Sequence, residues 1–277
     1  AFRARRQRFR ILRRAVGVAR TDLVLRTGGV AGLVYGQANT GVSDSLLLDQ
    51  RRAVAAAPVL GGSGDLDISL LFIDGGPRGR ADPMYEAHAA PIGMWAEAIW
   101  HQWLPVAALG ALFTHAVATL TRAKCVWSRV KGPAAAYVAS AWRLGWTTGS
   151  WDSASDDMGH SLTFNRDAPR FVRDAVYDSA RRWRWRRIER RLPALQTHIS
   201  GNGAFLTPIF RLLSRRPSSG WGPEQKGSLR SLVSGRQWPQ CRLSKAKLSK
   251  AHSPNCRLCV AYGLCSCLLY TSPSPRD

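Results

Sequence analysis

Apolar residues recur every three or four positions along much of the chain, which is the spacing of one face of an α-helix. Residues 2–19 combine this spacing with arginines at many of the other positions, so they are predicted to form a basic amphipathic helix. Ser43 is a suitable N-cap for a helix that continues to Ala57. Gly132-Pro133 is typical of the start of another helix. The predicted inward stripe of that helix consists of Tyr137, Ala141 and Leu144.

Two apolar segments differ from this pattern. Asp67–Asp74 is short, rich in Ile, Leu and Phe, and followed by Gly75-Gly76-Pro77, which predicts a strand. Residues 104–120 are 17 uncharged residues, which is at the short limit for a membrane span. His115, two threonines and a proline in this segment favour a buried core helix, and a single membrane segment is the competing interpretation.

The chain is therefore predicted to be mainly α, an irregular helical bundle with at most one or two short strands and a partly disordered C-terminal region. The expected parts are a basic N-terminal helix at 1–27, an apolar helical core region at 28–150, a basic Arg/Trp helical region with half a zinc knuckle at 151–266, and a tail at 267–277. The tail reads CLLYTSPSPRD and resembles a translated sequencing adapter, so the natural sequence is expected to stop near Ser266.

Charge is distributed unevenly along the chain. The 277 residues include 40 Lys and Arg against 18 Asp and Glu, which gives a formal net charge of +22. Residues 1–27 have nine Arg and one Asp, and residues 151–277 have 22 basic and nine acidic side chains, whereas residues 28–121 have four basic and eight acidic ones. The positive charge at both ends of the chain attracts polyanions, so RNA or DNA is the expected partner and an anionic membrane surface is the alternative. No small-molecule substrate is evident.

The most distinctive basic element is Pro169–Leu192, in which nine arginines and two tryptophans follow a helical pattern. The side chains predicted to contact phosphates are Arg181, Arg182, Arg184, Arg186 and Arg187. Trp183 and Trp185 are expected to divide between the core and base stacking. A second predicted contact consists of Lys245, Lys247 and Lys250. The alternative interpretation of Pro169–Leu192 is a solvated surface helix with an apolar seam.

Metal and catalytic chemistry have little support in the sequence. Cys256 and Cys259 form one Cys-x-x-Cys pair, whereas a tetrahedral zinc site usually needs two, so they represent an incomplete zinc site and no other cofactor is predicted. Asp156-Asp157 lies in a Gly/Ser-rich loop without the hydrophobic hairpin of a polymerase metal site, which favours a turn. The sequence has no phosphate-binding loop, zinc-protease or nucleophile-elbow motif, so this chain is not expected to be an enzyme.

Several motifs follow one another in a distinctive order. They are Tyr35-Gly36, Leu46–Arg52, Asp82-Pro83, Trp127, Lys131–Ala135, Arg143–Trp146 and the run RRWRWRRIERR. The most specific are C-terminal, and consist of Leu229–Gly235, Trp238-Pro239, Arg242-Leu243 and the Cys256/Cys259 pair. This order resembles the region downstream of the reverse transcriptase domain in non-long-terminal-repeat retrotransposon polyproteins of certain protists. In that family a further His and Cys complete the zinc knuckle, and they do not occur here before the tail.

The resemblance implies that the polymerase carboxylates lie upstream and that this segment helps to hold template RNA or target DNA. The predicted function is a non-catalytic nucleic-acid-binding segment of a retrotransposon reverse transcriptase polyprotein, in a nuclear or cytoplasmic ribonucleoprotein. Secretion is not expected, because the first residues contain no apolar signal-peptide core. The alternatives are a basic protein associated with membranes through residues 104–120, and a decayed or mistranslated element without a selected function.

Overall fold

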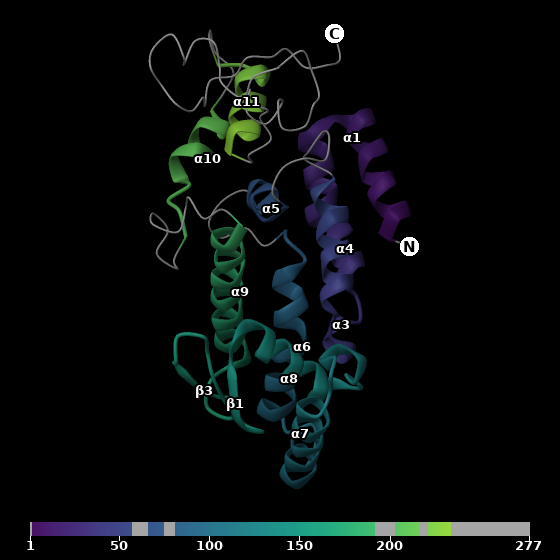
Figure 1. Ribbon diagram of the computed structural model, residues 1–277, viewed down its shortest axis with the longest axis vertical. Helices are drawn as coiled ribbons and strands as arrows, with labels where there is room; N and C mark the ends of the chain where they lie inside the picture. The colour runs from purple at the N-terminus through teal and green to yellow at the C-terminus, as the bar shows by residue number, and fades with distance from the viewer. Residues whose placement is uncertain (1, 57–65, 75–80, 192–202, 216–220, 234–277) are drawn as a thin grey trace. The chain divides into compact units, whose positions relative to one another are not determined.

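The computed structural model describes residues 2–56, 66–74, 81–191, 203–215 and 221–233 (Figure 1). These residues are mainly helical and include one small sheet of three short strands, which confirms the predicted fold class. Contacts divide the chain into two compact units: Ala1–Gly62 with Leu66–Ser214, and Ser63–Asp65 with Arg215–Asp277. The sequence predicts partial disorder in the C-terminal region. The residues from 234 onwards lie outside the described part of the chain.

The first unit contains a series of helices and the sheet. Its helices are α1 (Phe2–Val24), α2 (Val30–Val34), α3 (Gln37–Thr40), α4 (Asp44–Ala55), α5 (Leu66–Asp74), α6 (Met84–Trp100), α7 (Val106–Thr121), α8 (Pro133–Leu144), α9 (Pro169–Arg191) and α10 (Thr207–Ser214). Its strands are β1 (Thr147–Ser150), β2 (Ser153–Ser155) and β3 (Ser161–Thr163), paired antiparallel in that order. The second unit contains α11 (Pro223–Val233).

Several helix boundaries agree with the capping residues in the sequence. The Oγ of Ser43 accepts a hydrogen bond from the backbone N–H of Leu46 at 3.4 Å, so Ser43 caps α4 as predicted. The helix α8 begins at Pro133 and is followed by Gly145, whose φ of 88° places it in the left-handed region that favours glycine. Both ends of α8 are therefore determined by local sequence.

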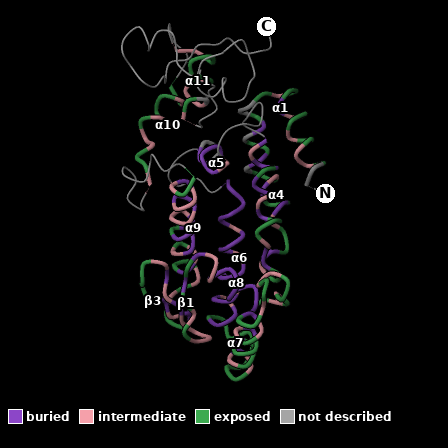
Figure 2. Tube along the Cα trace, viewed as in Figure 1, coloured by how far each residue is buried: buried purple, intermediate pink, exposed green. Residues whose placement is uncertain are grey.

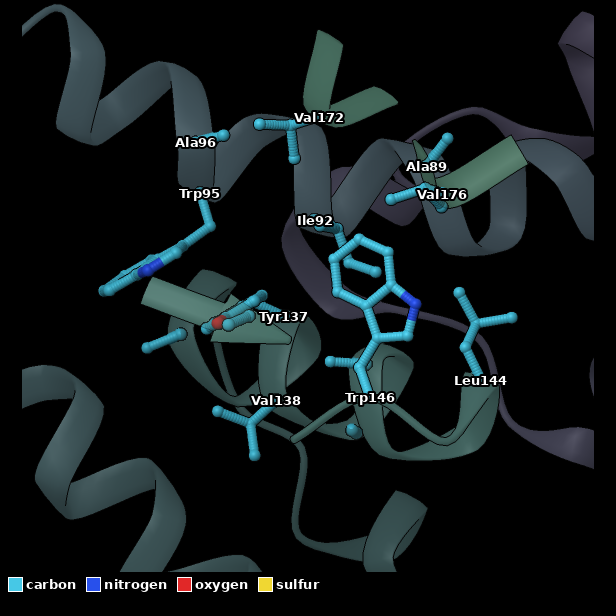
Figure 3. Packing of buried hydrophobic residues seen from close by; sticks show 14 of the residues in the cluster. Ala89, Ile92, Trp95, Ala96, Tyr137, Val138, Leu144, Trp146, Val172 and Val176 are labelled. Carbon is cyan, nitrogen blue, oxygen red and sulfur yellow. The ribbon is translucent and has the colours of Figure 1, made fainter. Parts of the chain in front are cut away.

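The main core lies where α6 packs against α8 and α9 (Figure 3). The ring of Tyr137 on α8 stacks on Trp95 of α6 with centroids 5.6 Å apart, and meets Phe164 edge-on at 5.7 Å. The predicted stripe of α8 is confirmed, because all three of its residues are fully buried. Trp146 follows α8 and its indole N–H donates to Ser179 Oγ of α9 at 2.8 Å. Complete burial of each large side chain here stabilises the fold by about 1.5–3 kcal/mol.

A smaller core joins α1, α2, α4 and α5. It consists of Leu25, Val30, Leu33, Val54, Leu70 and Ala81. Phe9 of α1 packs beside it, so close to Gly29 that a Cβ at that position would lie 3.0 Å from Phe9 Cζ. Within α1, Gly17 has φ 80° and ψ 173°, so it separates two helical parts.

The predicted strand at Asp67–Asp74 is wrong, because this segment forms the helix α5. Asp67 and Asp74 are buried at its two ends. A separation of seven residues places both carboxylates on one face of a helix, whereas in a strand they would point to opposite faces. Arg51 of α4 binds Asp67 and Arg184 of α9 binds Asp74, so both carboxylates of the helix have cationic partners.

The uncharged segment 104–120 forms α7, which is buried on only one side. The buried residues are Leu109, Phe113, Ala116 and Leu120. The prediction of a buried core helix therefore holds for one face and is wrong for the other, where Val106 and Leu112 are exposed. Within the described part of the chain, no helix has both the length and the apolar character that a membrane span requires.

Candidate nucleic-acid interface

Arg184 of α9 is part of a buried ion-pair network. Its side chain is about 3% exposed, Nη1 donates to Asp74 Oδ2 at 2.5 Å, and Nη2 donates to Tyr85 Oη at 3.0 Å. Burial raises the pKa of Asp74 to about 6, and the positive charge of Arg184 offsets only part of that increase. Arg184 therefore stabilises the interior, and its guanidinium is not presented to a phosphate at the surface.

The network continues to Arg51 of α4. Its guanidinium donates to the two carboxylate oxygens of Asp82 at 2.9 and 2.8 Å, and Nη2 lies 2.6 Å from Asp67 Oδ1. Burial alone raises the pKa of Asp82, but the charges of Arg51 and Arg184 bring the pKa below its usual value. Paired charges thus connect α4, α5, α9 and the residues that lead into α6.

Arg182 and Arg186 bind a second acidic site, in the turn after β2. Arg182 donates to Asp157 from Nη2 at 2.5 Å and from Nε at 3.0 Å, and Arg186 Nη1 donates to the same carboxylate at 2.8 Å. Arg186 Nη2 also donates to the backbone oxygen of Leu144 at 3.0 Å. The side chain of Asp156 accepts two backbone N–H groups of the turn, each at 2.8 Å, which confirms the predicted turn at Asp156-Asp157.

The remaining predicted residues of α9 also have partners within the chain. Arg181 pairs with Asp178 one turn earlier at 2.6 Å. Arg187 lies over the ring of Trp183 at 4.7 Å, and its Nε is 3.6 Å from Asp67 Oδ2. Arg51 lies 5.8 Å from the same Trp183 ring. The indole of Trp183 is half-buried and lies beside two guanidinium groups of the chain itself.

Trp185 is 6% exposed, and the backbone of Gly203 lies against its indole. A Cβ at Gly203 would lie 2.1 Å from the indole nitrogen, so only glycine fits there. The predicted role of Trp185 in the core is consistent with this burial. The ring has no exposed face on which a base could stack.

The helix α1 has several exposed basic side chains. Arg8, Arg10, Arg14 and Arg20 are all exposed. Among the described residues, no carboxylate pairs with any of these four. Arg10 and Arg14 are four residues apart and therefore lie on one side of the helix. Phe9 of α1 packs inward. The four exposed arginines, of which Arg20 follows the break at Gly17, are together called the α1 basic face below.

The sequence did not indicate the acidic partners of α9. Asp67, Asp74 and Asp82 are 100 or more positions away from the arginines of α9 that they bind, so no local sequence pattern indicates these pairs. One signal was present: the seven-residue spacing of Asp67 and Asp74 in an otherwise apolar segment. Lys245, Lys247, Lys250, Cys256 and Cys259 lie outside the described residues. In the described part of the chain, no three His, Cys, Asp or Glu side chains are grouped as a metal site.

Comparisons of the chain with protein-family models, with curated proteins and with solved structures give no match.

Proposed function

We propose that the chain is a non-catalytic nucleic-acid-binding segment of a retrotransposon-type reverse transcriptase polyprotein. Within the described residues, we propose that the α1 basic face is the main surface that contacts nucleic acid. The polyprotein origin is supported by the order of motifs in the sequence. The location of the contact is supported by the difference between the four exposed arginines of the α1 basic face and Arg182 and Arg184 of α9, which bind carboxylates within the chain.

The proposal rests on the exposure of four arginines between residues 8 and 20. A guanidinium binds a phosphate with two parallel N–H donors, and this interaction is stronger than that of a neutral donor. Each phosphate that is neutralised releases condensed counterions, so affinity falls as salt rises. Four such contacts predict a slope of log affinity against log salt of about −3 to −4 on duplex DNA.

The α1 basic face is suited to phosphates more than to bases. Phe9 packs inward beside Gly29, so its ring is not available for stacking. Arginines that contact phosphates position a protein on nucleic acid without reading the sequence. We therefore expect affinities that depend on length and salt, with little dependence on base sequence.

Fluorescence anisotropy with labelled duplex DNA and RNA, at salt concentrations from about 50 to about 200 mM, tests the contact. Changing Arg8, Arg10, Arg14 and Arg20 together to Gln is expected to reduce the magnitude of the slope by about 3. The matched control changes Arg122, Lys124, Arg129 and Lys131 to Gln. It removes the same charge from another exposed region. An unchanged slope in the first variant, or equal losses in both variants, would contradict the proposed location.

The polyprotein origin has a separate test. The transcript upstream of Ala1 is expected to contain an open frame that leads back to an aromatic-x-Asp-Asp polymerase motif. Stop codons in that frame would instead support a decayed element.

A further inference from the structure

Arg143 is a buried cation on α8, a helix that is itself largely buried (Figure 2). Its side chain is about 8% exposed, and Nη1 donates to Asp44 Oδ1 at 3.2 Å. The carboxylate of Asp44 is about 75% exposed, so water screens this ion pair. Among the described residues, the buried Nε and Nη2 of Arg143 have no hydrogen-bond acceptor. An unpaired buried N–H group is costly, so this guanidinium has donors left for a further partner.

Arg51 and Arg184 are also buried, but their charges are compensated inside the fold. Each lies within 3.5 Å of two buried carboxylates. Burial lowers the pKa of both arginines, but the carboxylates raise it above the usual value. For Arg143, burial lowers the pKa to about 10, because the exposed Asp44 offsets only part of this effect. Residues 98–151 contain no Asp or Glu, so this segment supplies no further carboxylate to Arg143.

The guanidinium of Arg143 is directed at the N-terminus of α4, because Asp44 is the first residue of that 12-residue helix. The N–H groups of a first helical turn have no intrahelical partner and carry partial positive charge, so they favour an anion. Asp44 and Ser45 are exposed, so this turn is open to solvent. Cζ of Arg143 lies 4.1 Å from the ring centroid of Trp127, and this cation–π contact helps to hold the guanidinium in place.

We propose that Arg143 and the first turn of α4 form a binding site for a phosphate group. The exposed side chain of Asp44 turns into solvent, and a phosphate oxygen takes its place on Nη1 of Arg143. The hydroxyl of Ser45 and the N–H groups of the first turn donate to the other oxygens. A phosphate has more negative charge and more acceptor oxygens than the carboxylate that it replaces, so it compensates the buried cation better. The phosphate belongs either to a free phosphate ion or to the end of a nucleic-acid strand.

Thermal unfolding of the full chain in sodium phosphate tests this inference, with NaCl added to keep the ionic strength constant. Constant ionic strength is needed because any anion screens a chain of charge +22. For a dissociation constant on the order of 1 mM, about 20 mM phosphate should raise Tm by about 3 °C or more. Arg143→Met should abolish this shift. Asp44→Asn should tighten phosphate binding by about fivefold, because it removes a like charge and a competitor for Nη1.

The matched control is Arg52→Met, which removes an exposed cation from the same helix α4 and should keep the full shift. Equal shifts in the parent chain and Arg143→Met would overturn the inference, as would weaker phosphate binding by Asp44→Asn. Asp44→Asn changes only an exposed side chain, so it tests the site even if Arg143→Met does not fold. The site is separate from the α1 basic face, so the variant that lacks the four arginines of that face should keep the phosphate shift.

Single-stranded oligonucleotides with a 5′-phosphate or a 5′-hydroxyl distinguish the two sources of the phosphate group. A preference for the 5′-phosphate that is lost in Arg143→Met would identify the end of a strand as the ligand. Equal binding of both oligonucleotides, together with the shift in sodium phosphate, would identify a free phosphate ion.

Discussion

Replacing Arg184 by Met measures how strongly the buried network holds α9 in place. Met has a similar length and no charge, so the change leaves Asp74 without its 2.5 Å partner and Tyr85 Oη without its donor. Removal of one member of a buried ion pair costs about 3–5 kcal/mol, because the other charge stays buried without compensation. A typical domain unfolds with about 5–15 kcal/mol, so the variant should lose a large share of its stability.

The expected loss depends on pH. The pKa of Asp74 is already raised to about 6 by burial, and loss of Arg184 raises it further. Below that pKa Asp74 takes up a proton and needs no cation, so the cost of Arg184→Met is smaller at about pH 5 than at about pH 8. Asp74→Asn in the same chain removes the unpaired carboxylate and should recover at least about 1 kcal/mol at the higher pH.

Urea unfolding followed by circular dichroism is a suitable assay, with the single and double variants arranged as a double-mutant cycle. Arg170→Met is the matched control, because Arg170 is exposed near the start of α9; it should change stability by less than about 0.5 kcal/mol. A loss below about 1 kcal/mol for Arg184→Met at about pH 8, or zero coupling in the cycle, would refute the reasoning.

Three further predictions concern stability, and urea unfolding checks each. The pKa of Asp82 is lowered in the folded state, so its contribution to stability is complete above about pH 4 and is lost as pH falls through the folded-state pKa. The pKa of Asp74 is raised in the folded state, so its buried carboxylate destabilises the fold increasingly from about pH 4 to pH 6. Asp74→Asn should therefore flatten the dependence of unfolding free energy on pH in that range. Ser43→Ala removes the cap of α4 and should cost about 1 kcal/mol, whereas unchanged stability would show that the 3.4 Å bond contributes nothing. Gly41 has φ 60° and its Cβ would lie 2.8 Å from Trp127, so Gly41→Ala should cost about 1–3 kcal/mol, and a neutral effect would contradict the close packing.

Helices whose limits depend on local residues were predictable from the sequence. Ser43 and Pro133 mark starts of helices because a cap and a first-turn proline act within a few positions of themselves. The segment Asp67–Asp74 was not predictable in this way, because its apolar composition suits a short strand equally well. Tertiary pairing of its terminal carboxylates with arginines of other helices selects the helix.

The same limit applies to the candidate site. The density of arginine and tryptophan in α9 is typical of both a polyanion-binding surface and an internal ion-pair network, and the difference depends on which acidic residues the fold places beside the helix. Asp157 and Asp74 occupy the donors of Arg182 and Arg184. Arg8, Arg10, Arg14 and Arg20 of α1 are exposed and bind no carboxylate among the described residues, so the charge of these four side chains remains at the surface.

We propose that nucleic acid contacts the α1 basic face while the arginines of α9 stabilise the fold. The most direct measurement is the slope of log affinity for duplex DNA against log salt concentration in two double variants. The α1 variant combines Arg8→Gln and Arg10→Gln, and the α9 variant combines Arg182→Gln and Arg186→Gln. We expect the α1 variant to be as stable as the parent chain and its slope to be smaller in magnitude by about 2. We expect the α9 variant to be less stable, while the slope measured for its folded molecules stays unchanged. A reduced slope only in the α9 variant would contradict the account.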